Sequence, residues 1–267
     1  MRDDHAAFVG SIPEYYDRIL VPLIFEEYAK DIASRLRRPQ SAVLELACGT
    51  GAVTKQLLGV LAPAGRITAT DLNHAMLDLA RGKVGDARID WRPANATNLP
   101  FDDGVFDAVV CQFGWMFFPD KAAAMREARR VLKSGGRLLY NVWDRISNCP
   151  VYFEVNAAVH DYFPKDAPAF YEVPFSMPDI GEHRRLMDEA GFRNASIEVV
   201  GYDGARMPAS EMADGIVRGS PTVAEIEQRG GDVAEVVDYI ARRLEKHFGG
   251  APFSSPMRAI VCSADAP

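Results

Sequence analysis

Small residues and two acidic side chains occur close together in the first half of the chain, in an order that suits binding of a nucleotide. Glu45 leads into a turn that contains Ala47, Gly49 and Gly51. Such small residues let the backbone turn sharply and pass close to a ligand. Asp71 follows about twenty residues later, where a carboxylate can accept hydrogen bonds from both hydroxyls of a ribose. The spacing therefore predicts a ligand that contains a ribose.

Two kinds of ligand suit such a turn, and two residues separate them. A dinucleotide fingerprint requires a glycine at the third position of G-x-G-x-x-G, and Thr54 holds that position here. Glu45 would repel a pyrophosphate but would attract a ligand that carries an ammonium group. The alternative is that Glu45 only accepts hydrogen bonds from amides of the turn. The turn favours a cofactor with an ammonium group over NAD.

Regular elements must hold this turn, and apolar runs alternate with helical patterns from residue 43 to residue 142. Continuous apolar strands separated by helices are typical of a parallel sheet covered on both faces. In such a sheet the turn after the first strand lies at the carboxyl edge, where ligands bind. The predicted strands are 42–46, 66–70, 89–92, 107–113 and 137–142, and the predicted helices are 52–61, 73–83 and 120–132, the last two capped by Asn73 and Asp120.

The second half of the chain interrupts this alternation twice. Residues 147–178 are rich in aromatic side chains and proline, and a stretch of this length should carry structure of its own or act as a lid. After a helix at 179–190 and a strand at 195–200 comes a helical insertion, in which Glu225 would complete a capping box with Thr222. A last strand follows at 257–263. The predicted units are a helical cap (1–40, with helices within 13–36), a core (41–146 and 179–202), a lid (147–178), a helical insertion (203–252) and the last strand with its tail (253–267).

Five short motifs occur in the order and at the spacing of one enzyme family. They are Val-Leu-Glu-Leu-Ala-Cys-Gly-Thr-Gly from Val43, Thr-Asp-Leu-Asn-His-Ala-Met-Leu from Thr70, Leu-Pro-Phe from Leu99, Phe-Asp-Ala-Val-Val-Cys-Gln from Phe106 and Arg-Val-Leu-Lys-Ser-Gly-Gly-Arg-Leu from Arg130. With them the chain resembles the class I S-adenosylmethionine-dependent methyltransferases, and among these it is similar to the ubiquinone and menaquinone C-methyltransferases.

The resemblance implies an α/β fold with a doubly wound, mostly parallel, seven-stranded Rossmann-like sheet. The last strand would be antiparallel, and helical cap and lid insertions would cover the site. The implied reaction is methyl transfer from S-adenosyl-L-methionine, with S-adenosyl-L-homocysteine as the product.

Carried over position by position, the resemblance also implies the cofactor contacts. They would be Glu45, Ala47, Gly49 and Gly51 along the methionine part, Asp71 at the ribose, Leu72 and Met76 on the adenine, Asn95 and Ala96 at the adenine edge, Gln112 at the amino-acid end and Tyr16 near the carboxylate. Family members often carry Gly in place of Ala47 and Asp in place of Asn95. The amide oxygen of Asn95 can still accept from the adenine amino group, so we expect cofactor binding to survive both changes.

Aromatic residues after the fourth predicted strand and in the lid are candidates for the pocket of the methyl acceptor. They are Trp115, Phe117, Tyr152 and Tyr171. The same side chains would suit a buried core, so wall and core remain alternative roles. His160 is the predicted general base because it lies among the tyrosines of the lid, whereas His74 and His183 are expected near the surface. No metal is expected, because Gln112 ends the fourth strand and no acidic cluster follows it.

Composition narrows the partners and the location. The formal net charge of −7 argues against a protein that grips nucleic acid through phosphate contacts. No long uncharged apolar run predicts a membrane span. The first residues lack the apolar stretch of a signal peptide, so the cytoplasm is the expected location. The four cysteines lack the paired spacing of a metal site.

The sequence therefore predicts a methyltransferase of a small, aromatic or apolar molecule. Whether carbon, oxygen or nitrogen accepts the methyl group stays open, as does the oligomeric state. Two alternatives also remain at this point: a methyltransferase of a macromolecule, and a non-catalytic member of the fold that binds the cofactor or a partner protein.

Overall fold

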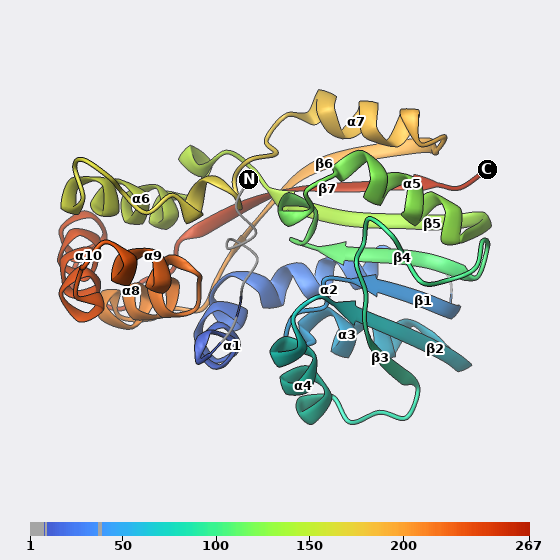
Figure 1. Cartoon of the computed structure of the whole chain (residues 1–267), viewed down its shortest axis with the longest axis horizontal. Coiled ribbons are helices and arrows are strands. Elements are labelled where there is room, and N and C mark those ends of the chain that lie inside the picture. Colours follow the sequence, from blue (N-terminus) through green and yellow to red (C-terminus); the bar gives the residue numbers. More distant parts are fainter. Residues whose placement is uncertain (1–7, 9, 37–38) are drawn as a thin grey trace.

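A computed structural model of the chain describes residue 8 and residues 10–36 and 39–267. Seven strands form one sheet in the order β3-β2-β1-β4-β5-β7-β6 (Figure 1). β7 runs antiparallel to both of its neighbours, and the pairs from β3 to β5 are parallel. The predicted fold class is therefore confirmed. The strands are β1 (Gln40–Leu46), β2 (Leu61–Asp71), β3 (Ile89–Pro93), β4 (Phe106–Gln112), β5 (Leu132–Trp143), β6 (Arg193–Asp203) and β7 (Pro256–Asp265).

Helices flank the sheet and extend beyond one of its ends. They are α1 (Ile12–Tyr15), α2 (Glu26–Ser34), α3 (Ala52–Leu57), α4 (His74–Lys83), α5 (Lys121–Val131), α6 (Pro150–Tyr162), α7 (Ile180–Glu189), α8 (Ala209–Arg218), α9 (Thr222–Gln228) and α10 (Val233–Phe248). A π-helical segment, Tyr16–Phe25, joins α1 to α2. The N-terminal part of the chain is thus one continuous helical stretch.

Alternate residues of β4 join two separate apolar clusters, which explains why the middle of this strand, residues 108–111, is apolar on both faces. Ala108 and Val110 pack with residues of α2, α3 and α4. Val109 and Cys111 pack on the other face, in the cluster that also contains residues of α5 and α7. A parallel strand covered on both faces cannot show the polar alternation of a half-exposed strand.

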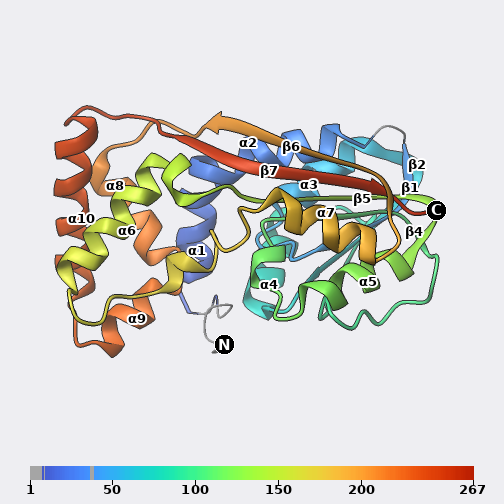
Figure 2. The same cartoon turned by 90° about the horizontal axis from the view of Figure 1, so that it is seen from above.

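The helices α6, α8, α9 and α10 pack together beyond the carboxyl ends of the parallel strands (Figures 1 and 2). α10 contacts α6, α8 and α9, and α8 also contacts the π-helical segment. Residues 147–178 contribute α6 and a 3-10 turn, Phe170–Glu172, to this group. The segment is therefore built into a helical layer rather than lying as a plain loop over the surface.

Several element boundaries differ from those predicted. The helix after the glycine turn ends at Leu57 rather than residue 61, because residues 58–60 form a 3-10 turn, and β2 begins at Leu61 rather than residue 66. β5 begins at Leu132, so the Ser-Gly-Gly run lies within the strand. Both strands extend towards the amino edge of the sheet, away from the ligand-binding edge.

The predicted helix caps had mixed outcomes. The carboxylate of Asp120 caps α5 by accepting from the N–H of Ala123 at 2.8 Å, as expected. Asn73 stands at the N-cap of α4 but makes no side-chain cap bond. The predicted capping box between Thr222 and Glu225 is wrong. The carboxylate of Glu225 instead accepts from the backbone N–H of Ala169 in the lid segment, at 2.6 Å. The lid segment, far away in the sequence, thus takes the place of Thr222 as the partner of Glu225.

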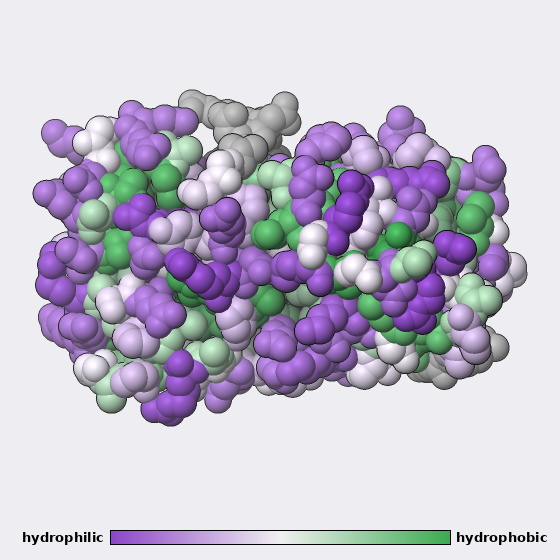
Figure 3. All heavy atoms as spheres, turned by 90° about the horizontal axis from the view of Figure 1, so that it is seen from below, coloured by the Kyte–Doolittle hydropathy of each residue, from purple (hydrophilic) through white to green (hydrophobic). Residues whose placement is uncertain are grey.

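None of the helices in the described residues is both long enough and apolar enough to cross a membrane. The same residues contain no group of three His, Cys, Asp or Glu side chains arranged to hold a metal ion. The face seen from below is largely hydrophilic, with apolar side chains in scattered patches (Figure 3). A cavity lined by apolar and polar residues lies at the carboxyl edge of the sheet.

Candidate functional site

This cavity opens where β1 to β5 end, between the sheet, the N-terminal helical stretch and the lid segment. The structure brings together on its wall every residue predicted at the cofactor except Glu45 and Gly51. Two groups of residues make up this wall. The first, called the polar side, consists of Ala47, Gly49, Asp71, Leu72, Met76, Asn95, Ala96 and Gln112. The second, called the aromatic side, consists of Tyr16, Phe25, Phe113, Phe117, Trp143, Tyr152 and Phe170, of which Phe113 directly follows β4 and Trp143 ends β5. The wall is thus polar in part on one side and mainly aromatic on the other.

The turn after β1 follows a left-handed backbone. Gly49 has a φ of +52° and Gly51 a φ of +82°, conformations that glycine adopts without strain. A Cβ on Gly51 would lie 3.3 Å from the Cβ of Ala80 on α4, closer than ordinary van der Waals contact. Gly51 therefore shapes the turn from behind by allowing α4 to approach, rather than by facing the cavity.

Asp71 ends β2, and its carboxylate holds two parts of the wall. Oδ2 accepts from the backbone N–H of Gly49 at 2.9 Å, and Oδ1 accepts from the N–H of Asn73 at 2.8 Å. Burial raises the pKa of this carboxyl, and the hydrogen bonds offset part of the rise. A carboxylate has about four lone-pair sites, so it can accept further hydrogen bonds from the cavity.

Glu45 is buried beneath the turn and lies outside the cavity lining. The hydroxyl of Thr54 donates to its Oε2 at 2.6 Å. Burial raises the pKa of Glu45 to about 8, and the negative charge of Asp71 adds to the rise against the opposing effect of the Thr54 hydrogen bond. Direct contact between Glu45 and a ligand, which the sequence suggested, is therefore not what this geometry provides.

Two amide side chains on the wall differ in their remaining capacity for hydrogen bonds. The Oδ1 of Asn95 accepts from both the N–H and the hydroxyl of Thr97, at 2.9 and 2.8 Å. The oxygen expected to serve the adenine is thus already engaged. Gln112 donates through Nε2 to the carbonyl of Phe25 at 3.2 Å. Its Oε1 is buried and has no hydrogen-bond partner among the residues that the structure describes.

Tyr16 extends from the helical cap over the glycine turn. Its ring stacks on Phe25 with centroids 4.9 Å apart, and its hydroxyl oxygen would lie 3.9 Å from a Cβ built on Gly49. The next residue, Asp17, forms an ion pair with Lys83 of α4, whose ammonium also donates to the carbonyl of Thr50 at 3.3 Å. The cap is therefore tied to the turn that it covers.

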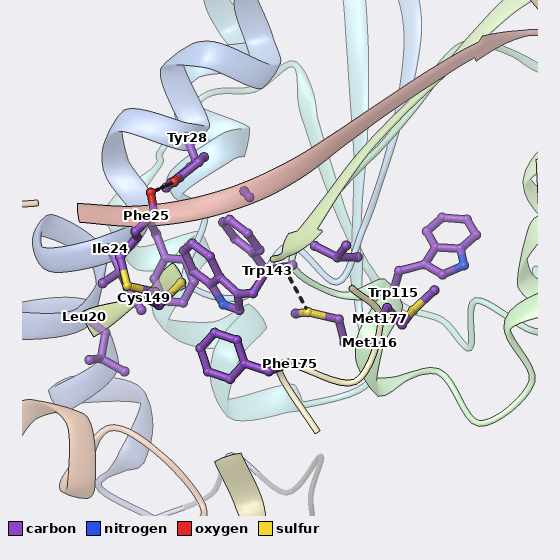
Figure 4. Packing of buried hydrophobic residues seen from close by; sticks show 14 of the residues in the cluster. Leu20, Ile24, Phe25, Tyr28, Trp115, Met116, Trp143, Cys149, Phe175 and Met177 are labelled. Carbon is purple, nitrogen blue, oxygen red and sulfur yellow. Dashed lines mark hydrogen bonds between the residues drawn. The ribbon is translucent and has the colours of Figure 1, made fainter. Parts of the chain in front are cut away.

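Stacked rings form the aromatic side of the cavity. Phe113 and Trp143 lie parallel with centroids 3.7 Å apart, and Phe25 packs on both (Figure 4). Phe113 has a φ of +52°, a conformation that a bulky residue rarely adopts. Phe117 stacks on Phe170 of the lid at 6.2 Å. The wall thus combines rings from the cap, two strand ends and the lid.

Two of the residues predicted for the acceptor pocket lie elsewhere. Trp115 is fully buried and packs on Tyr140 at 4.7 Å, pointing away from Trp143 (Figure 4). The 3-10 turn at Trp115–Phe117 sends its side chains in different directions, so Phe117 faces the cavity and Trp115 faces the core. Tyr171 is also outside the lining, and its hydroxyl donates to the carbonyl of Ile216 at 3.4 Å. Tyr152 does line the cavity.

The histidine predictions need correction. His160 lies on the exposed side of α6 and outside the cavity lining, so it does not stand where a base would act. His183, expected near the surface, is fully buried between the hydroxyl of Tyr140 (3.1 Å to Nδ1) and the carbonyl of Met177 (2.9 Å to Nε2). Burial lowers the pKa of its imidazole, so the ring is neutral near pH 7.

Sequence reasoning did not single out several residues of the wall, among them Phe25, Trp143 and Gly219. Trp143 could have been found by the rule that located Asp71, because it directly follows the predicted strand 137–142 and therefore lies at the carboxyl edge. Phe25 and Gly219 had no comparable signal, because they reach the cavity through the packing of separate helices.

Known proteins resemble this chain in sequence and in fold. A family model described as a methyltransferase domain matches residues 44–140. The ubiquinone/menaquinone biosynthesis C-methyltransferase of Shewanella halifaxensis is 33% identical over 205 residues, covering 70% of this chain and 75% of the relative. The solved phosphoethanolamine N-methyltransferase 2 of Haemonchus contortus has a TM-score of 0.59 at 15% identity, covering 97% of this chain and 61% of that one. The [4+2]-cyclase SpnF has a TM-score of 0.54 at 18% identity, covering 90% and 80%.

The two solved structures share the fold, and the curated relative adds sequence identity over 70% of this chain. The chain belongs to the class I S-adenosylmethionine-dependent methyltransferases. Enzymes of this family take a methyl group from S-adenosylmethionine and release S-adenosylhomocysteine.

Proposed function

We propose that this enzyme methylates a small, mostly apolar or aromatic molecule that carries an oxygen able to accept a hydrogen bond. The observation that carries the proposal is the mixed chemistry of one cavity, in which carboxylate and amide groups at the ends of β2, β3 and β4 line the same space as a group of aromatic rings. A cofactor with a ribose and an amino-acid end suits the polar side. An apolar acceptor suits the aromatic side, because such sites are lined mainly by apolar side chains with a few polar groups.

The polar side fits S-adenosylmethionine in two respects. The buried Oε1 of Gln112 needs a donor, and the ammonium group of the cofactor would supply one. Leu72 is 58% exposed on the wall, and the adenine would cover it. We assign the other contacts to Asp71 at the ribose, Met76, Asn95 and Ala96 around the adenine, Ala47 and Gly49 along the methionine part and Tyr16 at its carboxylate. Glu45 and Gly51 would support the turn from behind.

Tyr152 on the aromatic side offers a hydroxyl to an acceptor, whereas Tyr16 is assigned to the carboxylate of the cofactor. Tyr152 is 6% exposed, and its ring packs on Tyr171 and Phe175 with centroids 5.9 and 5.5 Å away. No described residue hydrogen-bonds to its hydroxyl. Burial raises the pKa of Tyr152 well above its ordinary value, so the phenol stays protonated and can donate. An acceptor with a carbonyl, hydroxyl or phenolate oxygen would satisfy it.

S-adenosylmethionine supplies an electrophilic methyl group when it is bound. The protein then has to align the acceptor and exclude water, and the rings of Phe113, Phe117 and Trp143 suit that task. The acceptor loses a proton as it gains the methyl group. We assign no part in this to His160, because it is exposed on α6.

Transfer of a labelled methyl group tests the proposal. Because the curated relative is named for ubiquinone and menaquinone biosynthesis, reduced naphthoquinones are suitable first acceptors, alongside simple phenols, total RNA and a protein extract. We expect label in the organic-soluble small molecules and an equal amount of S-adenosylhomocysteine. Label in RNA or protein would support a macromolecular substrate instead. If the cofactor binds but no acceptor is methylated, the result would support a member of the fold that does not transfer methyl groups. A cyclase shares this fold, so the fold alone does not require methyl transfer.

Replacing Tyr152 with phenylalanine should weaken acceptor binding and leave the cofactor site intact. The ring keeps its packing, and the loss of one neutral hydrogen bond of about 0.5–1.5 kcal/mol predicts a rise in the acceptor KM of roughly two- to tenfold. Tyr162→Phe, on the same helix but outside the cavity, is the matched control. Steady-state kinetics at saturating S-adenosylmethionine would measure both. Equal acceptor KM values in the two variants would remove Tyr152 from the acceptor site.

A further inference from the structure

A carboxylate on α9 forms hydrogen bonds with the lid segment, although the two are more than fifty residues apart in the sequence. The Oε2 of Glu225 accepts from the backbone N–H groups of Ala169 and Phe170, at 2.6 and 3.3 Å. These are the first N–H groups of the 3-10 turn Phe170–Glu172, and such groups have no partner within their own turn. Pro168, just before them, has no N–H to offer. Glu225 therefore caps this turn from another helix.

A second side chain, at the C-cap of α9, holds the same segment. Arg229, one helical turn after Glu225, donates through Nε to the carbonyl of Asp166 at 2.7 Å and through a terminal nitrogen to the carbonyl of Ala167 at 3.3 Å. It also forms an ion pair with the carboxylate of Asp166. Glu225 thus accepts from N–H groups of this segment and Arg229 donates to its carbonyl groups. Together they fix the backbone of residues 166–170 against α9.

The held segment ends at a residue of the cavity wall. Phe170 is buried, lines the cavity and stacks on Phe117. Its neighbour Tyr171 packs against Tyr152, so the segment also supports the one hydroxyl assigned to the acceptor. α9 itself follows directly on Gly219 and Ser220, which line the cavity as well. The hydrogen bonds of Glu225 therefore join two parts of one wall.

We propose that Glu225 is a positioning residue for the acceptor half of the cavity: by capping the turn at Phe170 it fixes the aromatic wall and so determines how tightly an apolar acceptor binds. The inference rests on the proposed function for the nature of the acceptor. The cofactor half does not depend on this contact, because Asp71 and Gln112 are held by the sheet and the cap. Glu225 should therefore affect one half of the cavity and spare the other.

The test compares Glu225→Leu with Glu227→Leu, an exposed position on the same helix. Two ligands are titrated separately into the full chain: S-adenosylhomocysteine by calorimetry, and the uncharged apolar dye N-phenyl-1-naphthylamine by fluorescence in the presence of saturating S-adenosylhomocysteine. We expect Glu225→Leu to weaken dye binding about tenfold, the equivalent of one charge-assisted hydrogen bond. Its affinity for S-adenosylhomocysteine should stay within about twofold of the parent, and Glu227→Leu should match the parent for both ligands.

Glu225→Gln serves as a milder variant in case Glu225→Leu does not fold. It keeps an acceptor oxygen but loses the charge, so we expect about a threefold loss of dye binding with unchanged S-adenosylhomocysteine affinity. Dye binding equal to the parent in a folded variant, or equal losses for both ligands, would overturn the inference. The dye assay does not use methyl transfer, so the absence of any small-molecule product would count against the proposed function and not against this role of Glu225.

Discussion

Replacing Asp71 with alanine should weaken binding of S-adenosylhomocysteine at least tenfold without unfolding the protein. Hydrogen bonds to a charged group contribute about 1.5–3 kcal/mol each, and a factor of ten in affinity corresponds to about 1.4 kcal/mol. The variant would lose the proposed ribose contact and also the bonds that hold Gly49 and Asn73 in the wall. Both losses act on the same ligand, so the expected effect is larger than that of removing a single contact.

Calorimetric titration of parent and variant measures this effect. Asp90→Ala is the matched control, because Asp90 is a partly exposed carboxylate on the neighbouring strand β3, paired with Arg92 and outside the cavity. A second variant, Asp71→Asn, keeps one acceptor oxygen and should lose less affinity than Asp71→Ala. Unchanged affinity in a folded Asp71→Ala protein would show that Asp71 does not hold the ribose.

Replacing Glu45 with glutamine should make the protein more stable than the parent at alkaline pH and leave the two similar near pH 5. The folded pKa of Glu45 is about 8, well above the ordinary value of 4.5. Between these values the folded state keeps a proton that the unfolded state releases, so the parent loses stability as the pH rises from about 5 to about 8. Each pKa unit is worth about 1.4 kcal/mol, so the full difference is of the order of 3–5 kcal/mol.

Urea unfolding at pH 5.5, 7 and 9 would measure the free energy of unfolding of both proteins. Glutamine retains an oxygen that can accept from the hydroxyl of Thr54, so the loss of that hydrogen bond should not obscure the result. Asp71 remains in both proteins, but it interacts with the charge of Glu45 only in the parent, so this interaction is part of the measured difference. Glu227→Gln, at an exposed site, should follow the pH dependence of the parent. A constant difference between parent and Glu45→Gln from pH 5.5 to 9 would contradict a raised pKa at Glu45.

The parts of the site that could be predicted from the sequence are those that stand at the ends of strands. Asp71 and Gln112 end apolar runs, and the carboxyl ends of parallel strands meet at one edge of a sheet. Their order along the chain was therefore enough to bring them together. The glycine turn was equally legible, since a left-handed backbone at Gly49 and Gly51 requires residues of that kind.

The aromatic half of the cavity could not be predicted in this way. Phe113, Trp115 and Phe117 are alike in composition, and only the backbone decides which of them faces the cavity. The left-handed φ of Phe113 and the 3-10 turn that follows it turn Phe117 towards the cavity and Trp115 towards the core. The residue types predict neither the left-handed φ nor the 3-10 turn, and a left-handed φ is seldom found at a bulky residue such as Phe113.

Glu225 shows a different limit of sequence reasoning. Its spacing from Thr222 matches a capping box, yet its carboxylate caps the turn at Phe170 instead. Both places present backbone N–H groups at the start of a helical turn, and tertiary packing decides between them. His183 is a similar case. A polar residue on a helix is expected at the surface, but here two groups outside that helix bond to both ring nitrogens and so allow burial.

Calorimetric titration of the parent protein with S-adenosylhomocysteine and, separately, with NAD tests the central claim most directly. The turn from Glu45 to Gly51, with Asp71 and Gln112 on the cavity wall, predicts a one-to-one complex with S-adenosylhomocysteine and no measurable binding of NAD. Binding of NAD together with the absence of any response to S-adenosylhomocysteine would contradict the account.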